Sequence, residues 1–320
     1  MAESQFNRLI VCVLAHNEET VIADTVLSLG SLQIEPGGTL DTFVFTNGCS
    51  DRTNDIVAAL AAIDSRVHLV ALPEKGKVYA ARASIAYFRT MHQQRPDFDR
   101  VFYVDADVTF PDSLTLIKMS RSLDRSVDLY LVSSFSLAET GQSNDNWFLS
   151  RFTAVREAVA RNLQANIVRG RCYVIRFNAL MQVDYPLDVL SDDLYLELRL
   201  NGHYIMDYSI LTATKLKSTF KGEIRRDLFT LMANDKLRHP VGGTKVVAVD
   251  SKTARKEWSL SFPRPRQLLR YVLSNAGFTT FVIMALWFPI HQFNQFRAKR
   301  IIRESRKRKM NLLDYWSTQR

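Results

Sequence analysis

The sequence has few cysteines, no leader-like start and no repeated segments. Its three cysteines, Cys12, Cys49 and Cys172, lie far apart and never in CxxC spacing. A disulfide framework or a zinc site is therefore not expected, and a reducing cytosol fits this usage. Residues 1–8 are polar, so no signal peptide is expected. The composition is also unlike that of disordered or collagen-like chains.

An excess of positive over negative charge is found mainly near the C-terminus. The formal net charge is +9, and residues 297–309 hold eight basic residues and one acidic residue, which leaves +7 in this run. A surface for nucleic acid would spread basic residues over the fold, so no nucleic-acid partner is expected. A basic run beside an apolar segment is more typical of contact with anionic lipid.

That apolar segment has no charged side chain from Tyr271 to Phe296, a span of 26 residues. Its densest part, Phe278–Ile290, has only 13 residues, whereas a bilayer needs about 20 to be spanned. A spanning helix, an interfacial or re-entrant helix and a buried core helix all stay open. An interfacial helix would keep the basic tail on the cytoplasmic side and place Trp287 among the lipid headgroups. We expect an anionic membrane surface as a partner and a location at its cytoplasmic face.

The first two thirds of the chain alternate short apolar runs with helical patterns. The expected strands are Leu9–Leu14, Thr42–Phe45, Val67–Leu72 and Val101–Val104, and the expected helices are Glu18–Leu29, Asp51–Ala62 and Lys77–Met91. This order predicts an α/β fold with a mostly parallel, Rossmann-like sheet flanked by helices. Ligands of such sheets bind beyond the carboxyl ends of the strands.

The pattern changes after Asp128. Further strands are expected at Leu129–Val132, Cys172–Ile175, Tyr204–Met206 and Leu211–Lys215, and further helices at Trp147–Ala165 and Ser191–Leu200. We predict a domain of residues 1–222 with halves 1–127 and 128–222, a helical extension over 223–270, and a membrane-associated apolar helix with a basic tail over 271–320.

Two carboxylates, Asp105 and Asp107, follow the fourth expected strand. In an extended chain they would point in opposite directions, so a turn must bring both toward one cleft. Oxygen-rich pairs of this kind hold hard divalent cations, which neutralise phosphate oxygens. A chance DxD sequence in a solvated loop is the alternative.

Polar residues also follow the other strands. Gly48 permits a tight turn, and the amide of Asn47 suits the edge of a nucleobase. Lys77 begins a helix, where an anionic ligand is favoured. Asp192 and Asp193 also begin a helix, where they either complement its dipole or supply a general base. Each feature alone also fits an ordinary loop or helix start.

Taken in order, these segments resemble the inverting glycosyltransferases of family 2, which have the GT-A fold. The matching segments, spread over residues 8 to 220, are Val13–Glu19, Asn47–Thr53, Gly76–Ala81, Asp105–Asp107, Gly170–Arg176 and Asp192–Gly202. The resemblance implies that a hydroxyl acceptor displaces the diphosphate of a nucleotide sugar with inversion.

The resemblance also implies the roles of individual residues. Asp105 and Asp107 would bind Mg²⁺ or Mn²⁺. The donor would contact Ala15, Asn17, Glu18, Asn47, Lys77 and Asp105. Asp193 would be the general base, with Asp192 supporting it.

Two features bear on the substrates. Asn47 stands where family members often have an aspartate that contacts uracil, although a UDP-sugar remains the favoured donor. No Q-x-x-R-W sequence follows Gly202, so transfer of one sugar is expected rather than polymerisation. The expected acceptor is a glycan or a lipid-linked molecule of polysaccharide biosynthesis.

Two other functions stay open. A nucleotidyltransferase would carry a glycine-rich and basic loop after its first strand, but Ala15 to Glu18 lacks both. A non-catalytic membrane-bound scaffold would keep the fold without metal-dependent nucleotide binding.

Overall fold

The computed structural model describes residues 8–139, 147–164, 166–168, 170–186, 189–215, 219–238 and 278–308. The chain forms two compact units. The first unit comprises residues 1–137, 166–187 and 195–215, and the second comprises residues 138–165, 188–194 and 216–320. The domain limits at residues 222 and 270 remain predictions.

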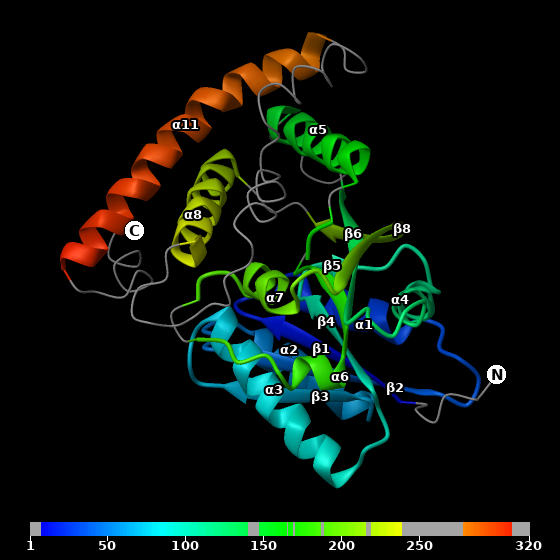
Figure 1. Cartoon of the computed structure of the whole chain (residues 1–320). Coiled ribbons are helices and arrows are strands. Elements are labelled where there is room, and N and C mark those ends of the chain that lie inside the picture. The colour runs from blue at the N-terminus through cyan, green and yellow to red at the C-terminus, as the bar shows by residue number, and fades with distance from the viewer. Residues whose placement is uncertain are drawn as a thin grey trace. The chain divides into compact units, whose positions relative to one another are not determined.

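One eight-stranded sheet has the strand order β3-β2-β1-β4-β7-β6-β8-β5 (Figure 1). The strands are β1 (Arg8–Ala15), β2 (Thr39–Asn47), β3 (Val67–Leu72), β4 (Arg100–Asp105), β5 (Val108–Thr109), β6 (Leu131–Glu139), β7 (Cys172–Arg176) and β8 (Tyr204–Lys215). Neighbouring strands from β3 to β4 are parallel. The α/β prediction is therefore confirmed.

The prediction of a mostly parallel sheet is wrong, because β7 runs antiparallel to both β4 and β6, and β5 runs antiparallel to β8. The physical reason lies at the start of β7. The main-chain carbonyl of Arg171 accepts a 2.8 Å hydrogen bond from the N–H of Asp105. The chain thus enters β7 at the carboxyl end of β4 and can only run back along it, which makes the sheet mixed.

Helices cover both faces of the parallel strands. They include α1 (Ile22–Gly30), α2 (Thr53–Ile63), α3 (Lys77–Gln94) and α4 (Thr115–Leu123). Val11 and Val13, both fully buried, share one apolar cluster with residues of α1, α2 and α4. Phe43 and Phe45 lie on the opposite face, where their rings contact Phe88 of α3. This alternation with period two is what a sheet buried on both faces requires.

Strand β8 corrects a second prediction. The sequence suggested two short strands, Tyr204–Met206 and Leu211–Lys215, but a single strand spans Tyr204–Lys215. Every second side chain from Tyr204 to Thr214 is buried except Tyr208, which is half-buried. Asp207 and Ser209 lie on the other face, where Ser209 Oγ donates to Asp207 Oδ1 at 2.5 Å and Ser122 Oγ of α4 donates to Asp207 Oδ2 at 2.8 Å. Because Asp207 and Ser209 are polar, the sequence suggested a break in a strand that is continuous in the structure.

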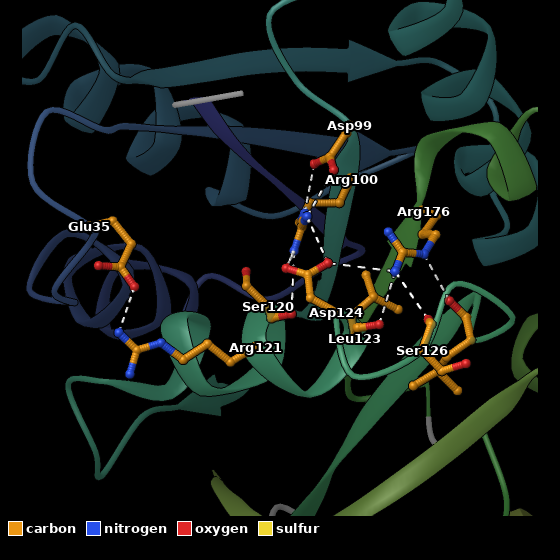
Figure 2. A network of polar contacts seen from close by, with 10 residues as sticks. Glu35, Asp99, Arg100, Ser120, Arg121, Leu123, Asp124, Ser126 and Arg176 are labelled. Carbon is orange, nitrogen blue, oxygen red and sulfur yellow. Dashed lines mark hydrogen bonds and ion pairs between the residues drawn. The ribbon is translucent and has the colours of Figure 1, made fainter. Parts of the chain in front are cut away.

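An ionic network fixes the start of β4 to α4 (Figure 2). The Arg100 guanidinium donates to Asp99 at 2.7 and 2.8 Å and to Asp124 at 2.9 and 3.1 Å. Arg176 of β7 also donates to the carbonyl of Leu123 at 3.0 Å. Burial alone would lower the pKa of Arg100, but the two carboxylates raise it above its ordinary value. The network therefore holds Arg100 charged within the fold.

Replacing Arg100 by methionine is expected to lower the free energy of unfolding by about 2 kcal/mol, because Asp99 loses its bidentate partner and Asp124 keeps only Arg176, at 3.5 Å. Figure 2 offers a matched control in Arg121, whose pair with Glu35 at 2.9 Å is exposed. Arg121→Met should cost less than about 1 kcal/mol. Urea unfolding of the two variants checks this difference, and equal losses would show that Arg100 contributes no more than a surface pair.

The second unit contains α5 (Trp147–Leu163), α8 (Phe220–Arg238) and α11 (Phe278–Lys307). Leu228 and Met232 of α8 share an apolar cluster with Ala298 and Ile301 of α11. Residues 239–277 and 309–320, which include most of the predicted helical extension and part of the basic tail, lie outside the described residues. Among the described helices, none is long and apolar enough to cross a membrane.

Trp287 corrects a third prediction. We expected this side chain at the level of lipid headgroups, but it is only 2% exposed. Its ring packs against Phe152 of α5, with 4.3 Å between centroids. An indole ring buries a large apolar area, so a neighbouring helix is a favourable place for it.

Candidate active site

The candidate site lies at the carboxyl edge of the parallel strands. In the sheet register Ala15 pairs with Thr46, Asn47 pairs with Leu72, and Leu14 pairs with Asp105. The ends of β1, β2, β3 and β4 therefore stand side by side. Each residue predicted to bind the donor is either the last residue of one of these strands or lies in the loop or helix start that follows it.

Asn47 ties three of these loops together. The side chain is 2% exposed. Its Nδ2 donates to the carbonyl of Ala15 at 2.8 Å, and its Oδ1 accepts from the N–H of Gly76 at 3.0 Å. Its own carbonyl lies 2.6 Å from His16 Nδ1. The Asn47 amide is thus hydrogen-bonded to the main chain of two other loops. It holds the three loops of the predicted donor site together.

Asn47→Asp is expected to lower the free energy of unfolding by about 3 kcal/mol, since a buried carboxylate would face the Ala15 carbonyl without a proton to donate. Asn17→Asp is the matched control. Asn17 is exposed, and its Nδ2 donates to the Ser50 hydroxyl at 3.3 Å, a group that can donate to a carboxylate instead. We expect a loss below about 1 kcal/mol for the control. Chemical unfolding measures both, and equally mild variants would refute the structural role of Asn47.

Hydrogen bonds connect the loop after β1 to the loop after β2. Asn17 has a positive φ of 56°, a conformation that asparagine tolerates better than most residues. Its Oδ1 also accepts a bond from the N–H of Ser50 at 2.8 Å. The N–H of Glu18 donates to Thr53 Oγ1 at 2.8 Å. The predicted donor residues of this loop are therefore held in place before any ligand arrives.

Gly48 shows how closely these loops approach each other. Its φ is +53°, and a Cβ added there would lie 3.0 Å from Cβ of Lys75. Its N–H donates to the carbonyl of Leu72 at 2.9 Å. Any other residue would be strained in this conformation and would push the loop after β3 away. The sequence predicted the tight turn, and the structure adds the close neighbour.

The acidic pair lies at the end of β4, since Asp105 is the last residue of the strand and Asp107 lies in the turn directly after it. Residues 106 and 107 form this turn, and the carbonyl of Ala106 accepts a 2.7 Å bond from Thr25 Oγ1 of α1. Lys77 Nζ lies 2.8 Å from Asp105 Oδ1. Burial raises the pKa of Asp107, and the charge of Asp105 raises it further, while Arg171 lowers it. The two carboxylates are thus close enough to repel each other, which favours a cation beside them.

Asp105 and Asp107 suit a hard divalent cation whose remaining coordination positions are open to a ligand and water. No group of three or more His, Cys, Asp or Glu side chains that could hold a metal occurs among the described residues. Mg²⁺ needs only one or two carboxylates when phosphate oxygens and water fill the remaining positions. Because the pKa of Asp107 is raised, protons compete with a cation there at a higher pH than at an ordinary aspartate.

Arg171 is a site residue that sequence reasoning missed. Its guanidinium donates to Oγ1 of Thr214, a buried residue of β8. It lies close enough to Asp107 to lower the pKa of that carboxyl. The sequence placed it in a segment that resembles a strand near the acceptor, without a role of its own. The structure puts a fixed positive charge beside the acidic pair.

Asp192 and Asp193 begin α7 (Asp192–Leu200), and both belong to the second unit. Asp192 is 7% exposed. Asp193 Oδ1 accepts bonds from the Ser191 hydroxyl and, at 2.8 Å, from the N–H of Leu194. These bonds fix the orientation of the Asp193 side chain. Both carboxylates also complement the positive end of the helix dipole.

A mixed, helix-flanked sheet with an acidic turn after its fourth strand is a GT-A-like fold, the class of the glycosyltransferases. The family model described as glycosyl transferase family 2 matches residues 10–183, more than half of the chain. The chain belongs to this family, as the resemblance in sequence indicated. No curated protein sequence matches the chain significantly.

Several solved structures are similar in fold. A mannosyltransferase of Pyrobaculum calidifontis, in complex with GDP-mannose and Mn²⁺, has 17% identity and a TM-score of 0.59, and the match covers 92% of this chain and 85% of that one. TarS residues 1–349 of S. aureus has 10% identity and a TM-score of 0.50, with coverage of 95% and 92%. Glucosyl-3-phosphoglycerate synthase of Mycobacterium tuberculosis, in complex with Mn²⁺, UDP-glucose and phosphoglyceric acid, has 18% identity and a TM-score of 0.47, with coverage of 74% and 82%.

Proposed function

We propose that this chain transfers one sugar from a nucleotide-sugar donor to a hydroxyl acceptor, with inversion at the anomeric carbon. The observation that carries the proposal lies at the end of β4 and in the turn after it, where Asp105 is close enough for its charge to raise the pKa of Asp107 at the edge formed by the parallel strand ends. Membership of glycosyl transferase family 2 supports it. The proposed metal is Mg²⁺ or Mn²⁺, held by Asp107 and Asp105, and the mannosyltransferase of similar fold holds Mn²⁺.

The donor would lie along the carboxyl edge. A bound metal neutralises the charge that develops on the departing diphosphate. Lys77 and Arg171 would add two fixed positive charges, since one pairs with Asp105 and the other lies beside Asp107. Groups held in place before the reaction stabilise a developing charge without the cost of reorganising solvent.

In this proposal Asp193 removes the proton from the acceptor hydroxyl, with Asp192 in support. The two hydrogen bonds that Asp193 accepts fix its orientation. A general base must reach the hydroxyl proton in a fixed geometry, so an oriented carboxylate suits the role. The oxygen of the acceptor then attacks the anomeric carbon from the side opposite the diphosphate.

A UDP-sugar stays the favoured donor. GDP-mannose is the first alternative donor to test, because the similar mannosyltransferase binds it. The proposed acceptor is a glycan or a lipid-linked molecule of polysaccharide biosynthesis. The proposed location is the cytoplasmic face of a membrane, which the basic run over residues 297–309 supports.

Hydrolysis of radiolabelled nucleotide sugars, with and without Mn²⁺, tests the proposed reaction. We expect slow, metal-dependent hydrolysis of one donor. Release of the nucleoside diphosphate from this donor should become faster when the acceptor is supplied. Pyrophosphate release from a nucleoside triphosphate and a sugar phosphate would instead identify a nucleotidyltransferase. A chain that neither binds nor hydrolyses any nucleotide sugar would be a scaffold.

A further inference from the structure

Helix α11 buries one face of its described part within the second unit. Trp287, His291, Asn294 and Ala298 follow one another at helical spacing and are all buried. His291 Nδ1 lies 2.8 Å from Asp227 Oδ1 of α8, and Asn294 Nδ2 donates to the other oxygen of Asp227 at 2.9 Å. Directional polar contacts of this kind fix the rotation of a helix about its axis. They therefore also decide which side chains of α11 face away from α8.

Large apolar side chains gather on the opposite face. Leu286 is 57% exposed, Phe293 is 61% exposed and Phe296 is 68% exposed. With Val282 and Phe288, α11 supplies five of the eleven exposed large hydrophobic side chains found among the described residues. The other exposed apolar residues lie on separate elements. A cluster of this kind on one helix face marks an interaction surface.

The same face becomes basic toward the C-terminal end of α11. Arg300, Arg303 and Lys307 are exposed and continue the row of Phe293 and Phe296 at spacings of three and four residues. The only acidic residue between Phe278 and Lys307 is Glu304. The row is thus apolar in its first half and positively charged in its second half, which complements an apolar layer bordered by negative charge.

We propose that this row, Leu286, Phe293, Phe296, Arg300, Arg303 and Lys307, docks on an anionic lipid surface. The phenyl rings enter the boundary between headgroups and acyl chains, and the basic side chains meet the lipid phosphates. An in-plane amphipathic helix binds in this way without crossing the bilayer. The inference deepens the proposed location and rests on it, and it assigns the contact to the outward face of α11 instead of to Trp287.

Sedimentation of the whole chain with vesicles tests the surface. We expect binding to phosphatidylcholine vesicles that contain phosphatidylglycerol and weak binding to pure phosphatidylcholine, with the difference lost at high salt. Phe293→Ser with Phe296→Ser should weaken binding about a hundredfold, because each ring contributes about tenfold. Arg300→Gln with Arg303→Gln should weaken it about 25-fold, since each charge contributes about fivefold.

Leu27→Ser with Ile63→Ser is the matched control, because these side chains are 59% and 80% exposed on other helices. It should bind vesicles as the wild type does. Wild-type protein that stays in the supernatant, or phenylalanine variants that sediment normally, would overturn the proposal. The proposal would also be overturned if the wild type formed a dimer that did not bind vesicles and that Phe293→Ser dissociated. The row would then bind a second copy of the chain. Vesicle binding needs no donor, so failure of the proposed reaction would leave this result unchanged.

Discussion

Asp107→Asn is expected to abolish the gain in nucleotide affinity that Mn²⁺ provides. The substitution keeps the shape of the side chain and removes one of the two charges that would hold the cation. In the wild type, Mn²⁺ should raise the affinity for UDP or GDP by about two orders of magnitude, because it offsets the repulsion between carboxylates and diphosphate. Calorimetric titration with and without Mn²⁺ measures this gain directly.

The fold itself should survive this change. Burial and the charge of Asp105 raise the pKa of Asp107, so its ionised form is disfavoured and a neutral amide suits the position. Asp112→Asn is the matched control, because 38% of the Asp112 side chain is exposed and it pairs with Lys118 at 2.5 Å, away from the acidic pair. The control should keep the metal-dependent gain. An Asp107→Asn protein that keeps the same gain would remove this carboxylate from the metal site.

Asp193→Asn is expected to lower the rate of sugar transfer by about 10²–10⁴-fold while leaving donor affinity nearly unchanged. An asparagine oxygen can accept the same bonds from the Ser191 hydroxyl and the Leu194 N–H that Asp193 accepts now. The geometry is therefore kept, and only the ability to take a proton is lost. Steady-state transfer rates and nucleotide titration of the same preparation separate the two effects.

Asp192→Asn serves as the comparison for this experiment. Asp192 is nearly buried at the start of the same helix, so its replacement tests whether any loss of charge in this turn slows the reaction. We expect a decrease of less than about tenfold, consistent with a supporting role. Equal rates in the wild type and the Asp193→Asn variant would exclude Asp193 as the base.

The parallel half of the sheet could be predicted because its strands are continuous apolar runs. The expected strand Val67–Leu72 has the observed bounds, and helix α3 extends past the expected Met91 only to Gln94. The direction of β7 could not be predicted, since it depends on where the chain re-enters the sheet. Strand β5 has only two residues, which is too short for any periodic pattern. Local patterns thus predict elements, while distant contacts decide their pairing.

The candidate site was predictable to a similar extent. The DxD residues and Lys77 were recognised because their residue types and positions at strand ends carry the chemistry. The engagement of Asn47 was not predictable, because its partners Ala15 and Gly76 lie 32 and 29 positions away in the sequence. Arg171 was missed for the same reason, since only the fold brings it beside Asp107.

Diffraction at the manganese absorption edge, from crystals grown with Mn²⁺ and a nucleoside diphosphate, tests the central claim most directly. The account predicts an anomalous peak between the carboxylates of Asp105 and Asp107, with diphosphate oxygens completing the coordination of the ion. A diphosphate bound without a peak at these carboxylates, or a peak elsewhere on the chain, would contradict it.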